Sequence, residues 1–193
     1  NLTDYYDETY LVDFVIDSIN SGNIPKDTQL IVRLHPTTIL AYFLKYNQME
    51  NVVLSYVDKY IPTLGWTMDN EDVDIMANIL YYSDVIISPG STVTIEAAVF
   101  DTPILFPTFN PRQQNLLDEF YKKNYWKKHF KKLIDDNLIM LQDTPAKLID
   151  GINNYLESPE SHKFKRNKIV KDYVHYTDGG STKRLVDLIK RVL

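Results

Sequence analysis

Residues 83–98, with the sequence SDVIISPGSTVTIEAA, decide the fold that we expect for this chain. They read as a short apolar strand, a turn that contains Gly90, and a helix that opens with hydroxyl residues. The same order of strand and helix recurs on both sides of this stretch. Strands are predicted at 29–34, 51–55, 84–88, 103–106 and 138–141, helices at 10–20, 37–48, 72–83, 91–100, 144–156 and 181–193, and a loop at 56–70.

Strands that alternate with helices, each strand an unbroken apolar run, indicate a parallel sheet with both faces covered. We therefore expect an α/β fold, a doubly wound parallel sheet of the Rossmann-like type with additional C-terminal helices. No repeat or linker divides residues 1–193, so we expect a single domain. Residues 1–9 lack the strand with which such a fold opens. Either the sheet forms without this strand or the chain begins just after it, and we expect the second, because a helix that begins near Tyr10 needs a strand to pack beside.

The composition excludes several classes of function. A net charge of −5 disfavours nucleic acid as a partner, because a polyanion is bound by a surplus of Lys and Arg. The absence of cysteine excludes disulfides and thiolate metal sites. No apolar run approaches the roughly 20 residues that span a bilayer, and the first residues carry no targeting pattern, so the cytoplasm is the expected location.

The turn around Gly90 is the first candidate for phosphate binding. A helix N-terminus offers unpaired N–H groups and a partial positive charge. Gly90 would let a ligand approach the backbone, Ser91 and Thr92 would add hydroxyl donors, and Glu96 could accept bonds from ribose hydroxyls. The structural alternative is that Ser91 only caps the helix and Glu96 is a solvated surface residue.

A second polar cluster, Arg33-Leu34-His35-Pro36, follows another predicted strand. A guanidinium and an imidazole at a strand end could both reach a phosphate, although a His-Pro pair after a strand is also typical of a simple turn. Ligands of open α/β sheets bind outside the carboxyl ends of the strands. We therefore expect the two clusters to converge on one anion pocket.

The order of these motifs resembles the C-terminal half of GT-B glycosyltransferases over residues 30–107, and more loosely in the C-terminal helices. The His-Pro and Ser-Thr motifs are similar to those of bacterial sialyltransferases, Kdo transferases of capsule synthesis and CDP-glycerol glycerophosphotransferases. The Ser-Thr block with Glu96 also resembles UDP-sugar transferases and UDP-N-acetylglucosamine 2-epimerase.

This resemblance assigns roles to particular residues. It implies that His35 is catalytic, because the imidazole would stabilise the departing nucleotide phosphate, and that Glu96 binds the ribose. Residues 65–67 fall where such enzymes hold the base. The residues implied in donor binding are Arg33, His35, Gly65, Trp66, Thr67, Ser88, Gly90, Ser91, Thr92 and Glu96.

The resemblance also implies a reaction without metal or cofactor, in which a CMP-, CDP- or UDP-linked donor is a substrate. The sequence has no Asp-x-Asp motif beside a strand end, and Asp72-Val73-Asp74 lies at a helix start, where capping is expected. In these enzymes the glycan acceptor and the general base belong to the N-terminal half. We therefore expect this half alone to bind donor without turnover.

A basic segment with interleaved aromatics, residues 121–132, allows three interpretations, of which binding of single-stranded nucleic acid is disfavoured by the overall acidity of the chain. Its aromatics could pack one face of a helix whose lysines are simply solvated. Alternatively the lysines could dock on anionic lipid, which would place the enzyme at the inner face of the membrane. That surface would consist of Lys122, Lys123, Lys127, Lys128, Lys131 and Lys132.

Three functions remain open from the sequence. The first is a glycosyl- or glycerophospho-transferase of cell-surface polysaccharide synthesis, such as capsule. The second is half of an epimerase, although the phosphate turn then has fewer glycines than expected, with Gly90 alone. The third is a non-catalytic nucleotide-binding or scaffold domain.

Overall fold

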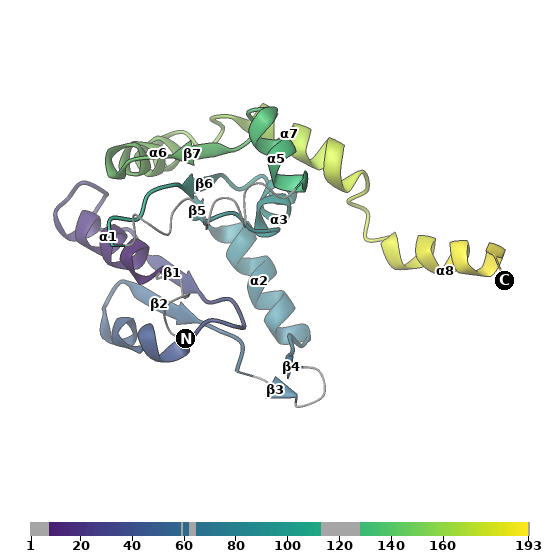
Figure 1. Cartoon of the computed structure of the whole chain (residues 1–193), viewed down its shortest axis with the longest axis horizontal. Coiled ribbons are helices and arrows are strands. Elements are labelled where there is room, and N and C mark those ends of the chain that lie inside the picture. Colours follow the sequence, from purple (N-terminus) through teal and green to yellow (C-terminus); the bar gives the residue numbers. More distant parts are fainter. Residues whose placement is uncertain (1–7, 59, 62–64, 113–127, 193) are drawn as a thin grey trace.

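The computed structural model describes residues 8–58, 60–61, 65–112 and 128–192, and its parallel strands form two sets (Figure 1). β1 (Leu30–Arg33) pairs with β2 (Val52–Ser55). β5 (Ile86–Ile87), β6 (Ile104–Pro107) and β7 (Met140–Gln142) form the second set in that order. The parallel pairing confirms the predicted α/β class, while within the described residues no ladder joins β1 to β5.

α1 (Thr9–Asn20) packs against both sets of strands. Its residues Val12 and Ile16 contact the cluster that includes Val32 of β1. Its residues Tyr10, Val15 and Ile19 belong to the cluster that includes Leu105 of β6. Because these two groups of apolar residues lie on one helix, α1 connects the two sets of strands.

Asp13 of α1 adds a polar link between the two parts. Its carboxylate accepts hydrogen bonds from Tyr46 Oη at 2.6 Å and from Lys45 Nζ at 3.0 Å, both beside β2, and from Arg112 Nη2 at 2.6 Å, beyond β6. Burial raises the pKa of Asp13, but the bonds from Tyr46, Arg112 and Lys45 outweigh it and lower the pKa below the ordinary value. The same burial and the bond to Asp13 raise the pKa of Tyr46.

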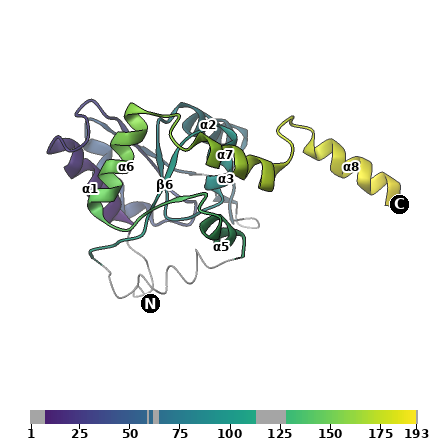
Figure 2. The same ribbon diagram turned by 90° about the horizontal axis from the view of Figure 1, so that it is seen from above.

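β6 is buried along its whole length, and helices cover it on both sides (Figure 2). Phe106 packs with residues of α3 (Val93–Val99), α5 (Lys128–Asp135) and α7 (Lys163–Ile169). Leu105 packs with α1 and with α6 (Pro145–Glu157). Gly151 of α6 lies so close that an added Cβ would come within 3.0 Å of the Leu105 side chain. This double cover is the reason for the continuous apolar run in the sequence.

Several helices begin and end where the sequence predicts. α2 covers Asn70–Tyr82 and α8 covers Ser181–Val192. The Thr144 hydroxyl accepts a hydrogen bond from the Lys147 N–H at 3.2 Å, so the predicted cap of α6 is confirmed. α7, which lies outside the predicted helices, continues into a π-helical turn, η5 (Val170–Val174).

Two predicted segments differ from the structure. The helix expected at 37–48 is replaced by two 3₁₀ helices, η2 (Leu40–Tyr42) and η3 (Leu44–Gln48), because the chain leaves β1 through a turn that occupies the first residues. The segment expected to be a loop contains an antiparallel hairpin of β3 (Tyr60–Ile61) and β4 (Gly65–Trp66).

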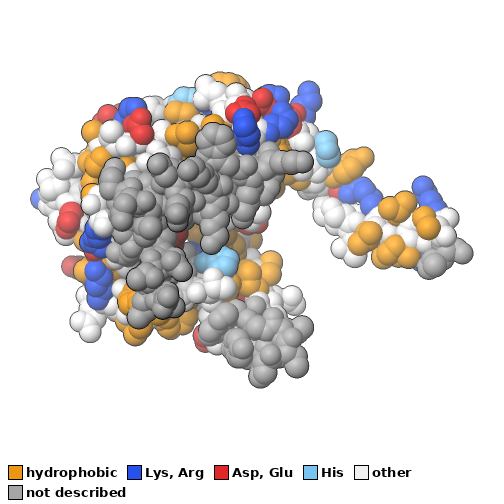
Figure 3. All heavy atoms as spheres, in the orientation of Figure 1, with side chains coloured by type: hydrophobic (Ala, Val, Ile, Leu, Met, Phe, Trp, Pro, Cys, Tyr) orange, Lys and Arg blue, Asp and Glu red, His pale blue; other side chains and the backbone are white. Residues whose placement is uncertain are grey.

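α8 projects away from the rest of the described chain (Figures 1 and 2). None of its described residues is buried, and its apolar side chains gather on a face that is visible in Figure 3. Arg184 pairs with Asp178 and lies 3.9 Å above the ring of Tyr176, so the start of α8 is tied to the segment that precedes it.

Candidate functional site

The His35 turn follows β1 and is built by local hydrogen bonds. The Thr38 N–H donates to the His35 carbonyl at 2.8 Å, with Pro36 in the second position of the turn, where its fixed φ is favoured. The Thr37 N–H donates to His35 Nδ1 at 3.2 Å, and the Thr37 hydroxyl lies 2.8 Å from the same nitrogen. The His-Pro pair is therefore a turn, and this turn leaves the imidazole exposed.

Arg33, two residues before His35, forms hydrogen bonds to two other residues of the chain. Its Nη1 donates to Ser55 Oγ at 2.8 Å, and its Nη2 lies 3.5 Å from Asp72 Oδ1. Both charged side chains are largely buried, with 14% and 13% exposed. Arg33 thus joins the ends of β1 and β2 to the start of α2, and its contact with a donor stays a prediction.

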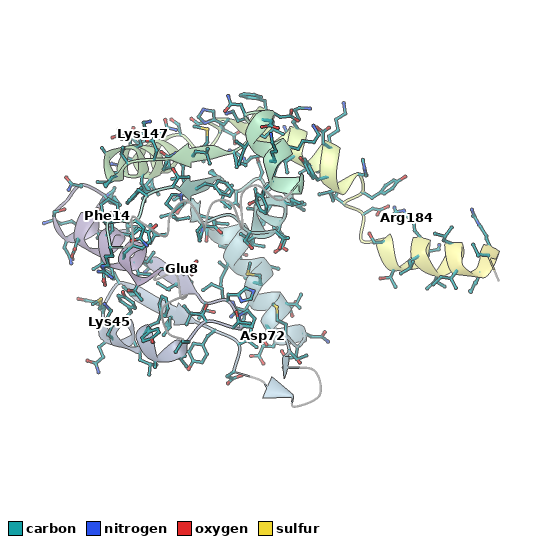
Figure 4. The ribbon with its side chains drawn as sticks, in the orientation of Figure 1. Glu8, Phe14, Lys45, Asp72, Lys147 and Arg184 are labelled. Carbon is teal, nitrogen blue, oxygen red and sulfur yellow. The ribbon has the colours of Figure 1, made fainter. Side chains whose placement is uncertain are left out.

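Asp72, where the sequence predicts capping rather than metal binding, closes a capping box at the start of α2. The Asp72 N–H donates to Asp69 Oδ1 at 3.1 Å, and the Asp69 N–H donates to Asp72 Oδ2 at 3.3 Å. The prediction of capping is confirmed, but its bond to Arg33 was missed. Figure 4 shows Asp72 beside the first part of α2.

The Ser88–Thr92 loop follows β5. Ser88 is buried, and its backbone N–H donates to the Leu105 carbonyl. Ser91 and Thr92, in contrast, are exposed. Gly90 has a φ of +80°, a conformation that L side chains rarely adopt, so glycine is needed for the turn itself.

The helix after this loop begins two residues later than predicted. The N–H and the hydroxyl of Thr94 donate to the Ser91 carbonyl at 3.0 and 2.7 Å, and Thr92 is the N-cap of α3 without a side-chain cap bond. The alternative in which Ser91 caps the helix is therefore wrong. The hydroxyls of Ser91 and Thr92 are not used in capping α3.

The other predicted donor residues lie on neighbouring elements. Glu96 is exposed on α3, one turn beyond Thr92. Gly65 and Trp66 form β4, where Trp66 is opposite Tyr60, but the Trp66 side chain lies outside the described part of the structure. Thr67 follows β4 and is partly buried. The role of residues 65–67 in holding a base stays a prediction.

The two polar loops share a structural base, because Leu30 of β1 and Ile87 of β5 pack against the same apolar cluster with α1. Within the described residues, no hydrogen bond joins His35 to Ser91 or Thr92. The structure brings Arg33, Ser55 and Asp72 together, and the shared anion pocket stays a prediction.

Residues 6–191 match the family described as CDP-glycerol:poly(glycerophosphate) glycerophosphotransferase. The chain belongs to this family. The match extends beyond residues 30–107 and confirms one of the resemblances found in the sequence, that to the glycerophosphotransferases. No curated protein and no solved structure shows significant similarity to the chain.

Membership in the glycerophosphotransferase family makes the chain part of a family of transferases for a cell-surface polymer. In the part of the chain that the structure describes, no three His, Asp or Glu side chains are grouped so that they could hold a metal ion. Over the same residues, no helix has both the length and the apolar character to cross a membrane.

The basic segment of this glycerophosphotransferase chain is described only in part. Lys131 and Lys132 on α5 form ion pairs with Asp135 and Asp136, which favours a solvated helix face. Lys122, Lys123 and Lys127, and the side chain of Lys128, lie outside the described part of the structure. Contact with anionic lipid through these lysines stays a prediction.

A small pocket that the sequence analysis missed lies beside the beginnings of β6 and β7 rather than beside the two polar loops. Lys165 lines it and is buried, with Nζ 3.3 Å from Asn137 Oδ1, and burial lowers its pKa. His162 also lines this pocket, and its Nδ1 lies 3.1 Å from Tyr155 Oη. Its pKa is lowered by burial and by the nearby Lys165 and Arg166.

Proposed function

We propose that this chain binds CDP-glycerol, the donor in its family's description, between the His35 turn and the Ser88–Thr92 loop. The proposal depends on one observation, namely that the hydroxyls of Ser91 and Thr92 in the Ser88–Thr92 loop are exposed and do not cap α3. Both residues follow a glycine at φ +80°. Hydroxyls that do not stabilise their own helix are free to donate to a diphosphate.

The chemistry that follows is transfer of glycerophosphate to a poly(glycerophosphate) acceptor. A hydroxyl of the acceptor attacks the glycerol-bearing phosphorus, the bond from that phosphorus to the bridging oxygen breaks, and CMP departs with the electron pair. Negative charge develops on the departing phosphate, where prearranged donors stabilise it most. We assign this role to the His35 imidazole together with Ser91 and Thr92, without a metal.

The wider arrangement is part of the same proposal. Glu96 would accept bonds from the ribose hydroxyls, and the β4 segment with Trp66 would lie against the cytosine. We further propose that the chain is the donor half of a GT-B enzyme, with the acceptor site and the general base in another half. The match to the family over residues 6–191 supports the donor class, and the two loops support the location of the site.

The direct test is calorimetric titration of the chain with CDP-glycerol, CDP, CMP and UDP. We expect binding with a preference for cytidine nucleotides. The variants Ser91→Ala and Thr92→Val should each weaken binding of CDP by about 1–3 kcal/mol, the range for losing a hydrogen bond to a charged group. Their melting temperatures should change little, because the hydroxyls are exposed.

Thr182→Val is a matched control, since Thr182 is an equally exposed hydroxyl on α8. It should leave affinity unchanged. Full affinity in both loop variants would remove the hydroxyls from the site. Tighter binding of UDP would favour an epimerase-like half, and no binding of any nucleotide would favour a scaffold domain.

A further inference from the structure

The His35 turn contains one feature that the proposed function does not use, namely two groups of Thr37 directed at the same imidazole nitrogen. The Thr37 N–H donates to His35 Nδ1 at 3.2 Å, and Thr37 Oγ1 lies 2.8 Å from that atom. Both residues are exposed, so neither contact is a by-product of core packing. Pro36 and the bond from Thr38 to the His35 carbonyl hold the turn in shape.

These contacts determine where the proton of a neutral ring resides. A backbone N–H can only donate, so Nδ1 must present its lone pair, and the ring proton is inferred to lie on Nε2. The Thr37 hydroxyl can rotate to donate to the same lone pair. The ring is therefore held in one orientation with an N–H donor at its far side.

We propose that Thr37 is a positioning residue that fixes the tautomer and orientation of His35, so that Nε2–H is the bond offered to the donor phosphate. This inference rests on the proposed function for the identity of the anion. A donor that is already oriented loses less conformational entropy on binding than a ring that must rotate first. Thr37 itself need not touch the substrate.

The same geometry explains why Arg33 and His35 have different roles although they are two residues apart. Arg33 has its guanidinium occupied by Ser55 and Asp72. Among the residues that the structure describes, the hydrogen bonds of the His35 ring are made by Nδ1 within its own turn, and Nε2 has no partner. The turn thus presents a single donor.

The test uses nitrogen NMR of the histidine rings together with the affinity for CDP. The chain has four histidines, and His35→Gln assigns the resonances of His35. At about pH 8, wild type should show an unprotonated, hydrogen-bonded Nδ1 and a protonated Nε2. Thr37→Val removes the hydroxyl but keeps the backbone N–H and the side-chain shape.

In Thr37→Val the backbone N–H still favours a proton on Nε2, but the shorter contact from the hydroxyl is lost. We therefore expect both ring nitrogens of His35 to shift part of the way toward the values of a mixed tautomer population, and the affinity for CDP to fall about five-fold. Thr37→Ser, which keeps the hydroxyl, should restore both. A wild-type proton on Nδ1, or a Thr37→Val spectrum and affinity identical to wild type, would overturn the proposal.

One result separates this inference from the proposed function. If Thr37→Val changes the ring nitrogens while neither it nor His35→Gln alters the affinity for CDP, Thr37 does position His35 but the ring does not contact the donor. The melting temperature of each variant checks that the turn, not the fold, has changed.

Discussion

The two sets of parallel strands differ in what stabilises them. In the β5–β6–β7 set, β6 is buried along its whole length and has apolar clusters on both faces. In the β1–β2 pair, Ile31 and Val53 are 44% and 58% exposed, and the strand ends are tied by the contacts of Arg33. One set depends on apolar packing, whereas the other depends in part on polar cross-links.

This contrast extends to the loops that we propose as the site. In the loop after β5, the hydroxyls of Ser91 and Thr92 do not cap α3. At the end of β1, by contrast, Arg33 bonds to Ser55 and one nitrogen of His35 is used in its own turn. Apolar burial stabilises the β5–β6–β7 set without these hydroxyls, which supports the role in binding that we propose for them.

The largest effect that we expect is in β6. Leu105→Ala and Phe106→Ala each remove a fully buried side chain, and each should lower the free energy of unfolding by about 3–5 kcal/mol. Val53→Ala in β2 is the control and should cost no more than about 0.5 kcal/mol, as is usual for an exposed position. Urea unfolding measures all three. A cost for Val53→Ala as large as for Leu105→Ala would show that the outer face of β2 is covered.

A smaller effect is expected from the cross-link of Arg33. Arg33→Met should lower the free energy of unfolding by about 2 kcal/mol, because Asp72 and Ser55 are left without their largely buried partner. A double-mutant cycle with Asp72→Asn should give a coupling energy of about 1 kcal/mol. Strictly additive costs would show that the contact of 3.5 Å between Nη2 and Oδ1 contributes no stability of its own.

The smallest effect concerns the polar link at Asp13, which joins the two sets. Its folded-state pKa is lowered, because hydrogen bonds from Tyr46, Arg112 and Lys45 outweigh the effect of burial. A group with a depressed folded pKa stabilises the fold above its unfolded pKa, near 3.8, and loses this contribution as pH falls through the folded pKa.

Urea unfolding between about pH 6 and about pH 3 should therefore show a steeper loss of stability on the acid side in wild type than in Asp13→Asn. The variant should also be less stable at the upper end of this range. Parallel pH profiles for the two proteins would mean that Asp13 does not link the two sets of strands energetically.

Much of the fold could be predicted because apolar periodicity is a local signal. α1, α2, α6 and α8 begin and end within about two residues of the predicted ranges, and β1 and β2 fall inside theirs. The failure at 37–48 also has a local cause, since Pro36 and the bonds of Thr37 and Thr38 begin a turn where the pattern predicts a helix. The hairpin around Gly65 was missed because its strands contain only two residues each.

The candidate site was less predictable, because its decisive contacts are distant in the sequence. The partners of Arg33 are 22 and 39 residues away, and no local pattern indicates that they will meet. In contrast, the contact between Thr37 and His35 spans two residues and follows from the turn. The sequence could not predict that the hydroxyls of Ser91 and Thr92 leave α3 uncapped, since either residue could have capped the helix.

The position of α1 between two sets of strands also bears on the order of folding during synthesis. Its contacts with Val32 and Tyr46 can form once the first third of the chain has left the ribosome. Its contacts with Leu105, Leu148 and Tyr155 can form only after those residues have been synthesised. The hydrogen bond to Asp13 likewise needs Arg112, which is 99 residues later in the sequence. Until then Tyr10, Val15 and Ile19 lack most of the side chains that cover them in the folded chain, with Ile24 as the one other buried member of the cluster already present. We therefore expect this face of α1 to be accessible to a chaperone during synthesis.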